Sequence, residues 1–163
     1  SKGDFRHFAA IMAISGIADA VVNIDLIQGG TIFALAHIVA IAFYAKHRRS
    51  KLTPSQSALG IMLPVANVVI TYSVTQDPLH AAYGLVSGIM AGMAWTSSFP
   101  RYRVGVGVVL FLISDLMIFT GIGSSAESAL PRMTIWLVYY FAQFLIAIGV
   151  VQTLVKRSHI RTE

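Results

Sequence analysis

The sequence predicts an all-α protein, a polytopic bundle of six transmembrane helices. Of its 163 residues, 56% are apolar and only 12% are charged, whereas roughly a quarter of the residues in a soluble globular domain are charged. The apolar residues gather in long runs separated by short polar connectors, and a helix of about 20 apolar residues spans the hydrocarbon core of a bilayer. These observations exclude a single soluble domain and indicate one transmembrane helical domain over residues 1–163.

Six apolar runs are interpreted as spans, because helices satisfy their own backbone hydrogen bonds in hydrocarbon. The first run contains Asp19 and lacks a convincing cleavage site, which favours a true span over a signal peptide. Gly84, Gly88 and Gly92 repeat every four residues in the fourth run, a pattern that lets another helix approach closely. The runs cover residues 8–23, 28–45, 58–75, 81–98, 104–122 and 134–155.

The distribution of basic residues predicts the topology. Eleven of the twelve Lys and Arg residues fall on alternate connectors and at the two termini, and only Arg132 falls on the other side. Short loops rich in Lys and Arg remain in the cytoplasm. We therefore expect both termini and the basic loop 46–51 to face the cytoplasm, in the plasma membrane if the cell is bacterial.

Several classes of chemistry find no support in the sequence. The net charge of +5 is divided between apolar runs and forms no single basic face of the kind that binds nucleic acid. No cysteine is present, and no local ligand spacing indicates a metal site. All lysines lie at the ends of the runs, so none could hold retinal inside the membrane. We expect no metal and no cofactor.

Asp19 and Asp115 are the most informative residues, because both lie inside predicted spans. An acidic side chain there costs about 3 kcal/mol on insertion scales and is usually retained for function. The two spans run in opposite directions, which places both acids at similar depth toward the non-cytoplasmic side. We expect them to share one cavity, although each could also serve only as a hydrogen-bond acceptor between helices.

Other polar residues fall at a compatible depth. Ser15, Asp19 and Asn23 form a polar stripe on the first span, and His37 lies near the middle of the second. Taken singly, such residues are more often contacts between helices than ligand-binding groups. Their expected convergence on the two aspartates favours a site. Two further polar faces are expected to converge on the same aspartates: Pro64, Asn67 and Thr71 in the third span, and Trp136, Tyr139, Tyr140 and Gln143 in the sixth.

Four ordered segments resemble the YhhN-like membrane proteins, whose eukaryotic relatives are the lysoplasmalogenases. The segments are ISGIAD at 14–19, FALAH at 33–37, LFLISD at 110–115 and YYFAQFLIA at 139–147. The resemblance covers nearly the whole chain. It implies an enzyme that hydrolyses the vinyl ether bond of lysoplasmalogens, with a lysophospholipid substrate and membrane lipids as its partners.

The resemblance also implies roles for individual residues. Asp19 and Asp115 match the two intramembrane acids of the family and are the expected catalytic pair. The resemblance leaves open which of them is the acid, and we assign that role to Asp115 because it is the more deeply placed in its span. Ala18 and Ala40 depart from the Gly and Tyr that the family commonly has there. The family pattern has about eight helices, so about two N-terminal helices are expected to be missing from this chain. The expected substrate-binding residues are Ser15, His37, Tyr139, Tyr140 and Gln143.

Two functions from other classes stay open on the sequence. A proton-coupled transporter also places acids and a histidine inside the membrane. A structural membrane subunit would use them as hydrogen bonds between helices. The sequence predicts neither the oligomeric state nor the preferred acyl chain and headgroup.

Overall fold

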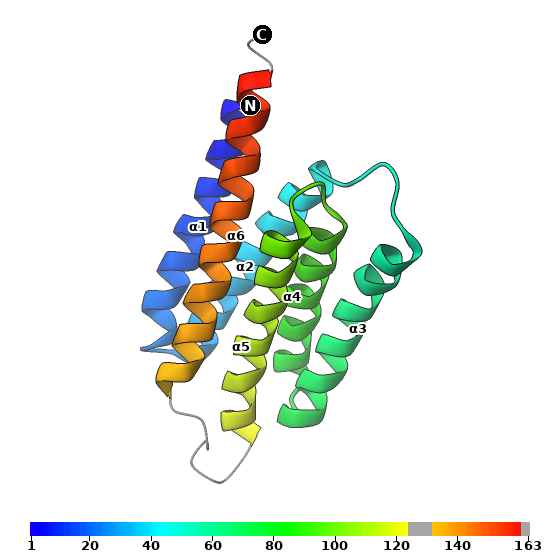
Figure 1. Ribbon diagram of the computed structural model, residues 1–163. Coiled ribbons are helices and arrows are strands. Elements are labelled where there is room, and N and C mark those ends of the chain that lie inside the picture. The colour runs from blue at the N-terminus through cyan, green and yellow to red at the C-terminus, as the bar shows by residue number, and fades with distance from the viewer. Residues whose placement is uncertain (124–131, 161–163) are drawn as a thin grey trace.

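The described residues form a bundle of six α-helices (Figure 1). The computed structural model describes residues 1–123 and 132–160, and these contain no strand. This architecture confirms the predicted all-α class. The helices are α1 (Lys2–Val22), α2 (Leu26–Lys46), α3 (Pro54–Thr75), α4 (Pro78–Thr96), α5 (Val106–Gly123) and α6 (Arg132–Ile160), with a π-helical turn, η1 (Arg101–Gly105), leading into α5.

Local sequence signals explain where the helices begin. The Asp25 carboxylate accepts hydrogen bonds from the backbone N–H groups of Ile27 and Gln28 and so caps α2. Asp77 caps α4 in the same way through Leu79. Both α3 and α4 start at a proline, whose missing N–H costs nothing in the first turn of a helix.

In the described part of the chain, five of the six α-helices are long and apolar enough to span a membrane, and α4 is not among these five. The prediction of six helices is therefore confirmed, but composition alone supports five spans. α4 lies between its neighbours and contacts α2, α3, α5 and η1. Eight of its 19 residues are buried, with small residues prominent among them. A helix enclosed by protein needs less apolar surface than one that faces lipid.

The glycine face of α4 packs against α3, as the four-residue repeat predicted. A Cβ atom on Gly88 would lie 2.6 Å from the Cα of Pro64, and one on Gly92 would lie 2.5 Å from the carbonyl oxygen of Gly60. Contacts this short are possible only for glycine, so the repeat sets the distance between the two helices.

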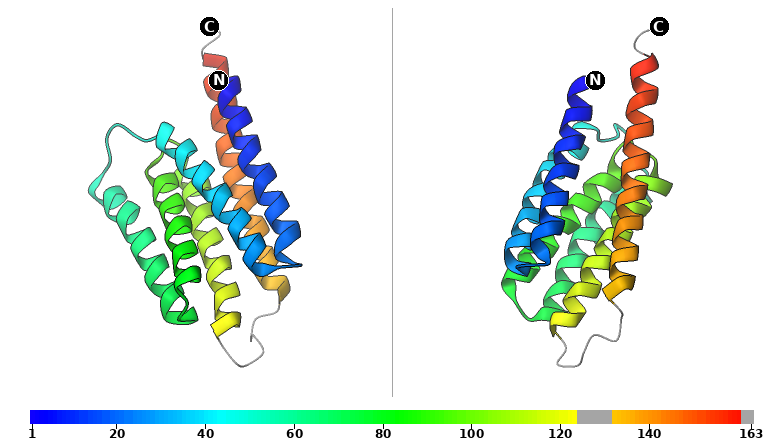
Figure 2. Two further views of the ribbon diagram at one scale, coloured as in Figure 1. Left: turned by 180° about the vertical axis from the view of Figure 1, so that it is seen from behind. Right: turned by 90° about the vertical axis from the view of Figure 1, so that its left-hand side faces the viewer.

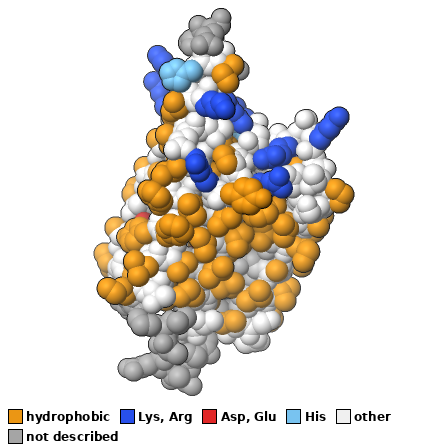
Figure 3. Space-filling view, viewed as in Figure 1, with side chains coloured by type: hydrophobic (Ala, Val, Ile, Leu, Met, Phe, Trp, Pro, Cys, Tyr) orange, Lys and Arg blue, Asp and Glu red, His pale blue; other side chains and the backbone are white. Residues whose placement is uncertain are grey.

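The outer surface has the distribution of a membrane protein. Large hydrophobic side chains on α3 are exposed at four-residue spacing, at Ile61, Val65 and Val69. Among the residues coloured in Figure 3, hydrophobic side chains cover most of the visible face and the Lys and Arg side chains lie toward one end. Both termini lie at this basic end (Figures 1 and 2).

Polar contacts close the basic end of the bundle. Lys46 at the end of α2 forms an ion pair with Asp4 at the start of α1, with 2.7 Å between Nζ and Oδ1. The Arg49 side chain donates hydrogen bonds to the carbonyl oxygens of Ser97 and Phe99. These bonds fix the connector between α4 and η1 against the loop that follows α2.

Candidate functional site

A chain of three polar side chains lies inside the bundle, and each comes from a different helix. Asp115 on α5 is only 7% exposed, and its Oδ2 accepts a hydrogen bond of 2.9 Å from the Tyr83 hydroxyl on α4. The same hydroxyl lies 3.2 Å from Nε2 of His37 on α2. Since the Tyr83 proton is directed at Asp115, its oxygen accepts from His37, which places the imidazole proton on Nε2.

A second polar group forms around Asp19 on α1. The Tyr139 hydroxyl on α6 interacts with the Asp19 carboxyl and accepts a hydrogen bond of 3.0 Å from the Gln143 side-chain amide. The other feature of Asp19 is an unsatisfied atom: its Oδ1 is buried and has no hydrogen-bond partner among the described residues. Such an oxygen is costly in a protein interior unless a ligand or water pairs with it.

Tyr139 joins the two groups. Besides interacting with Asp19, its hydroxyl lies close enough to Asp115 for an electrostatic interaction. Aromatic rings fill the space between them, since Phe111 contacts both His37 and Tyr139, at ring separations of 5.1 and 5.6 Å, and Phe33 also contacts Tyr139. Both acids thus belong to one cluster of polar groups walled by aromatic rings.

The remaining expected substrate-binding residues differ in their placement. Ser15 is buried on α1, one turn before Asp19. Tyr140 is 57% exposed, whereas its neighbour Tyr139 is 6% exposed. The Tyr140 ring stacks on Trp136 at 5.5 Å. The structure therefore brings Tyr139 into the cluster and leaves Tyr140 on the outer face of α6.

The polar residues of the third span do not join the acids. The Asn67 amide donates to the carbonyl oxygen of Gly84, at 2.7 Å, and to the hydroxyl of Ser87, at 3.1 Å, and Thr71 lies against Gly84. The expectation that this face converges on the aspartates is wrong, because these side chains are used in the contact between α3 and α4.

Tyr83 is the member of the cluster that the sequence did not single out. It lies between the Pro78 start of α4 and the glycine repeat. An aromatic residue at such a position is usually interpreted as an anchor at the membrane interface. Its depth is the available signal, since a tyrosine near the non-basic end of α4 is level with acids near the same end of α1 and α5.

The cluster offers carboxyl, hydroxyl, imidazole and amide groups in a water-poor setting. Among the described residues, no group of three or more His, Cys, Asp or Glu side chains is placed to hold a metal ion. Two acids near one another can divide the roles of proton donor and of anion, as in glycoside hydrolysis, where one carboxyl protonates and the other stabilises a cation or activates water.

Comparisons with known proteins give one finding. No curated protein and no solved structure is significantly similar to the chain. The family model of the YhhN family matches residues 3–150, which include every residue of the cluster described above, on α1, α2, α4, α5 and α6. The match covers most of the sequence, and the chain belongs to the YhhN family.

Proposed function

We propose that the protein is a membrane-embedded hydrolase that cleaves the vinyl ether bond of lysoplasmalogens. The observation that carries this proposal is the pair of acids within the spans, the buried Asp115 and the half-buried Asp19, which both interact with Tyr139. The YhhN family includes lysoplasmalogenases. The products are a fatty aldehyde and a glycerophospho-ethanolamine or glycerophosphocholine.

The reaction begins with a proton transfer. In the proposed mechanism, Asp115 in its protonated form donates a proton to the alkene carbon that is not bonded to the ether oxygen. The alkene electrons form the new C–H bond, and the positive charge that remains is an oxocarbenium ion. The hydrogen bond from Tyr83 uses Oδ2 and leaves Oδ1 of Asp115 to carry the transferred proton.

Water completes the reaction. Asp19 in its ionised form stabilises the oxocarbenium ion and accepts a proton from the attacking water, which adds to the cationic carbon and forms a hemiacetal. As the hemiacetal breaks its bond to the glycerol oxygen, that oxygen takes the proton held by Asp19, and the hemiacetal hydroxyl gives its proton to Asp115 as the aldehyde carbonyl forms. Aldehyde and alcohol are released, and both acids return to their starting protonation states. The unsatisfied Oδ1 of Asp19 supports this role, because it is free to pair with that water.

His37 and Tyr83 orient the acid in this mechanism. His37 donates a hydrogen bond to Tyr83, and Tyr83 donates one to Asp115. These direct bonds hold the Asp115 carboxyl in one rotamer. Tyr139 is supported by Gln143 in the same way. Such preorganisation reduces the rearrangement that the protein must undergo as charge develops.

The proposal includes an orientation in the membrane. The basic end of the bundle, with both termini and the loop after α2, faces the cytoplasm, because loops rich in Lys and Arg remain there. α4 crosses the membrane with the other five helices, enclosed by its neighbours. In this orientation Asp19 and Asp115 lie in the non-cytoplasmic half of the bilayer.

One experiment separates hydrolysis from transport. The purified protein is incubated with a lysoplasmalogen of defined acyl chain, and released aldehyde is measured with the protein in detergent. The same preparation in liposomes is assayed for proton-dependent solute uptake. Aldehyde release supports the hydrolase, whereas uptake without aldehyde release contradicts it and favours the proton-coupled transporter.

A further inference from the structure

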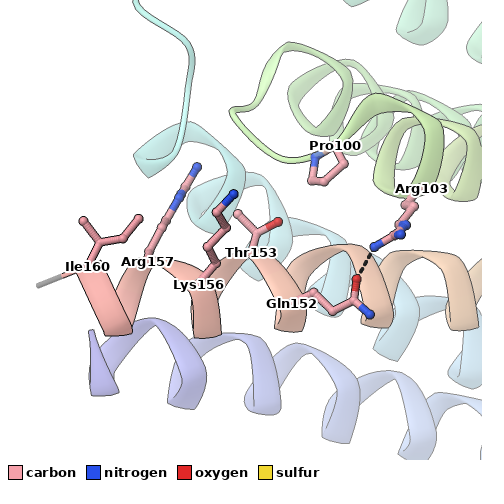
Figure 4. A pocket seen from close by; sticks show the side chains of 7 residues that line it. All are labelled: Pro100, Arg103, Gln152, Thr153, Lys156, Arg157 and Ile160. Atoms are coloured by element: carbon pink, nitrogen blue, oxygen red, sulfur yellow. Dashed lines mark hydrogen bonds between the residues drawn. The ribbon is translucent and has the colours of Figure 1, made fainter. Parts of the chain in front are cut away.

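A cavity at the basic end of the bundle lies apart from the acid cluster. It encloses about 400 Å³ between η1 and the last turns of α6. Figure 4 shows the side chains that line it, with the hydrogen bond between Arg103 and Gln152 crossing from one element to the other. Three of the lining residues, Arg103, Lys156 and Arg157, are basic, and none is acidic.

Among the described residues, no acidic side chain neutralises the three cations of this cavity. Within residues 1–123 and 132–160, no ion pair involves Arg103, Lys156 or Arg157. This distinguishes them from Lys46 at the same end, whose charge is paired with Asp4. Three uncompensated positive charges around one cavity attract an anion.

Neutral contacts hold two of these cations in position. The Arg157 guanidinium donates to the Ser98 hydroxyl at 2.8 Å and lies over the Phe99 ring, 5.4 Å from its centroid. Arg103 donates to the side-chain oxygen of Gln152. Lys156 makes no polar contact in the described part of the chain and keeps three donors for a ligand.

Gly149 allows this wall to form. A Cβ atom there would lie 2.6 Å from Cγ2 of Val104 and 3.0 Å from Cβ of Arg103, so only glycine lets η1 approach α6 this closely. The π-helical turn thereby places Arg103 over α6, one turn before Lys156. Single-turn π-helical segments often occur at functional positions in helices.

The cavity is too far from the acids to bind the phosphate of a lipid that is being cleaved there. Gln143 and Lys156 are 13 residues apart on the continuous helix α6, which corresponds to about 20 Å along its axis. The glycerol unit that joins a vinyl ether oxygen to its phosphate is much shorter than this. Whatever binds among the cations is a separate molecule.

We infer that this cavity binds the phosphate group of an anionic phospholipid from the surrounding leaflet. The basic end adjoins the hydrophobic surface that faces lipid (Figure 3), and the cavity itself is bordered by Ile160, which is 65% exposed. A headgroup phosphate would meet the cations while its acyl chains lay along α6. Free phosphate offers the same chemistry without the chains.

The test uses native mass spectrometry of the purified protein titrated with dioleoyl phosphatidylglycerol or dioleoyl phosphatidylcholine. The variant Arg103→Gln/Lys156→Gln removes two exposed charges and leaves the anchored Arg157 in place. Since each basic residue near an anionic headgroup contributes about fivefold to binding, we expect the variant to bind phosphatidylglycerol about 25-fold more weakly. The matched control Lys2→Gln/Lys51→Gln removes two exposed charges at the same end, outside the cavity, and should bind like wild type.

The outcomes distinguish the cavity from nonspecific charge and the lipid from free phosphate. Equal weakening in the control, unchanged binding in the cavity variant, or equal affinity of wild type for the two lipids would each overturn the inference. Inorganic phosphate is added separately in a thermal unfolding assay. If it raises the Tm of wild type as much as phosphatidylglycerol does, the ligand is free phosphate and the lipid assignment is wrong.

Discussion

The Tyr83 hydroxyl links the buried Asp115 carboxyl to the buried His37 imidazole. In the proposed mechanism this hydroxyl orients Asp115. The ring also contacts His37 and Phe119, so Tyr83→Phe keeps the packing and removes the hydrogen bond to Asp115. We expect kcat to fall about 10- to 100-fold, because Tyr83 no longer donates a hydrogen bond to the carboxylate that forms as Asp115 gives up its proton. KM should stay unchanged, because Asp115 is neutral in the substrate complex. Steady-state kinetics of aldehyde release measure both parameters.

The matched control for this variant is Tyr72→Phe. Tyr72 is 47% exposed on the outer side of α3, away from the acids. It should keep wild-type kinetics. A loss of similar size in Tyr72→Phe, or a normal kcat in Tyr83→Phe, would show that the Tyr83 hydroxyl does not orient Asp115.

The adjacent tyrosines of α6 give a second prediction. Tyr139 faces Asp19 and is 6% exposed, whereas Tyr140 is 57% exposed. Tyr139→Phe removes the hydroxyl that bonds to Asp19 and should lower turnover about tenfold or more. Tyr140→Phe should leave the rate of aldehyde release unchanged. The reverse order of effects would place the substrate on the outer face of α6 instead.

At the scale of elements, the contact between α3 and α4 depends on glycine. Gly88→Ala places a methyl group 2.6 Å from the Cα of Pro64, and such overpacking typically costs about 1 to 3 kcal/mol. The control Gly16→Ala adds the same methyl to α1, where nothing lies within 4 Å. We expect a lower Tm in detergent for Gly88→Ala only. Equal Tm values for the two variants would mean that α3 and α4 can separate at little cost.

The number of helices could be predicted from the apolar runs, but the ends of the helices and their arrangement in the bundle could not. α1 begins at Lys2, six residues before the apolar run, and α6 continues to Ile160, five residues beyond it, because charged side chains are tolerated in a helix that extends out of the bilayer. The enclosure of α4 is a property of its neighbours. The hydropathy pattern of residues 81–98 therefore does not predict that this helix is enclosed by the others.

The same division applies to the candidate site. Asp19, Asp115 and His37 could be selected because polar residues inside an apolar run are conspicuous. Tyr83 was missed because a tyrosine near a helix end has an ordinary interfacial explanation. The sequence places Asn67 at the depth of the acids, but its side chain bonds to α4. The sequence reveals the depth of a residue in its span and not the direction of its side chain.

At the scale of the whole molecule, the termini, the loop after α2 and η1 share one end (Figure 1). The proposed orientation places this end in the cytoplasm.

The orientation can be tested by labelling single cysteines, because the sequence contains no cysteine of its own. Lys51→Cys lies at the basic end, and Ile24→Cys lies at the other end on a residue that is 88% exposed. In sealed cells, an impermeant maleimide should label Ile24→Cys and spare Lys51→Cys. The opposite pattern would invert the proposed orientation. The distribution of basic residues also predicts that Ser124 faces outside, and Ser124 is not among the described residues.

The most direct test of a shared acid pair is the rate of aldehyde release from a defined lysoplasmalogen by Asp19→Asn, Asp115→Asn and the double variant. Asn keeps the size of Asp but cannot exchange the proton, so each single variant should lose about 100- to 10,000-fold in rate. Because the two acids serve one reaction, the double variant should be little slower than either single variant. Thermal unfolding in detergent should remain close to wild type in all three. Near wild-type turnover in either folded single variant would contradict catalysis by this pair.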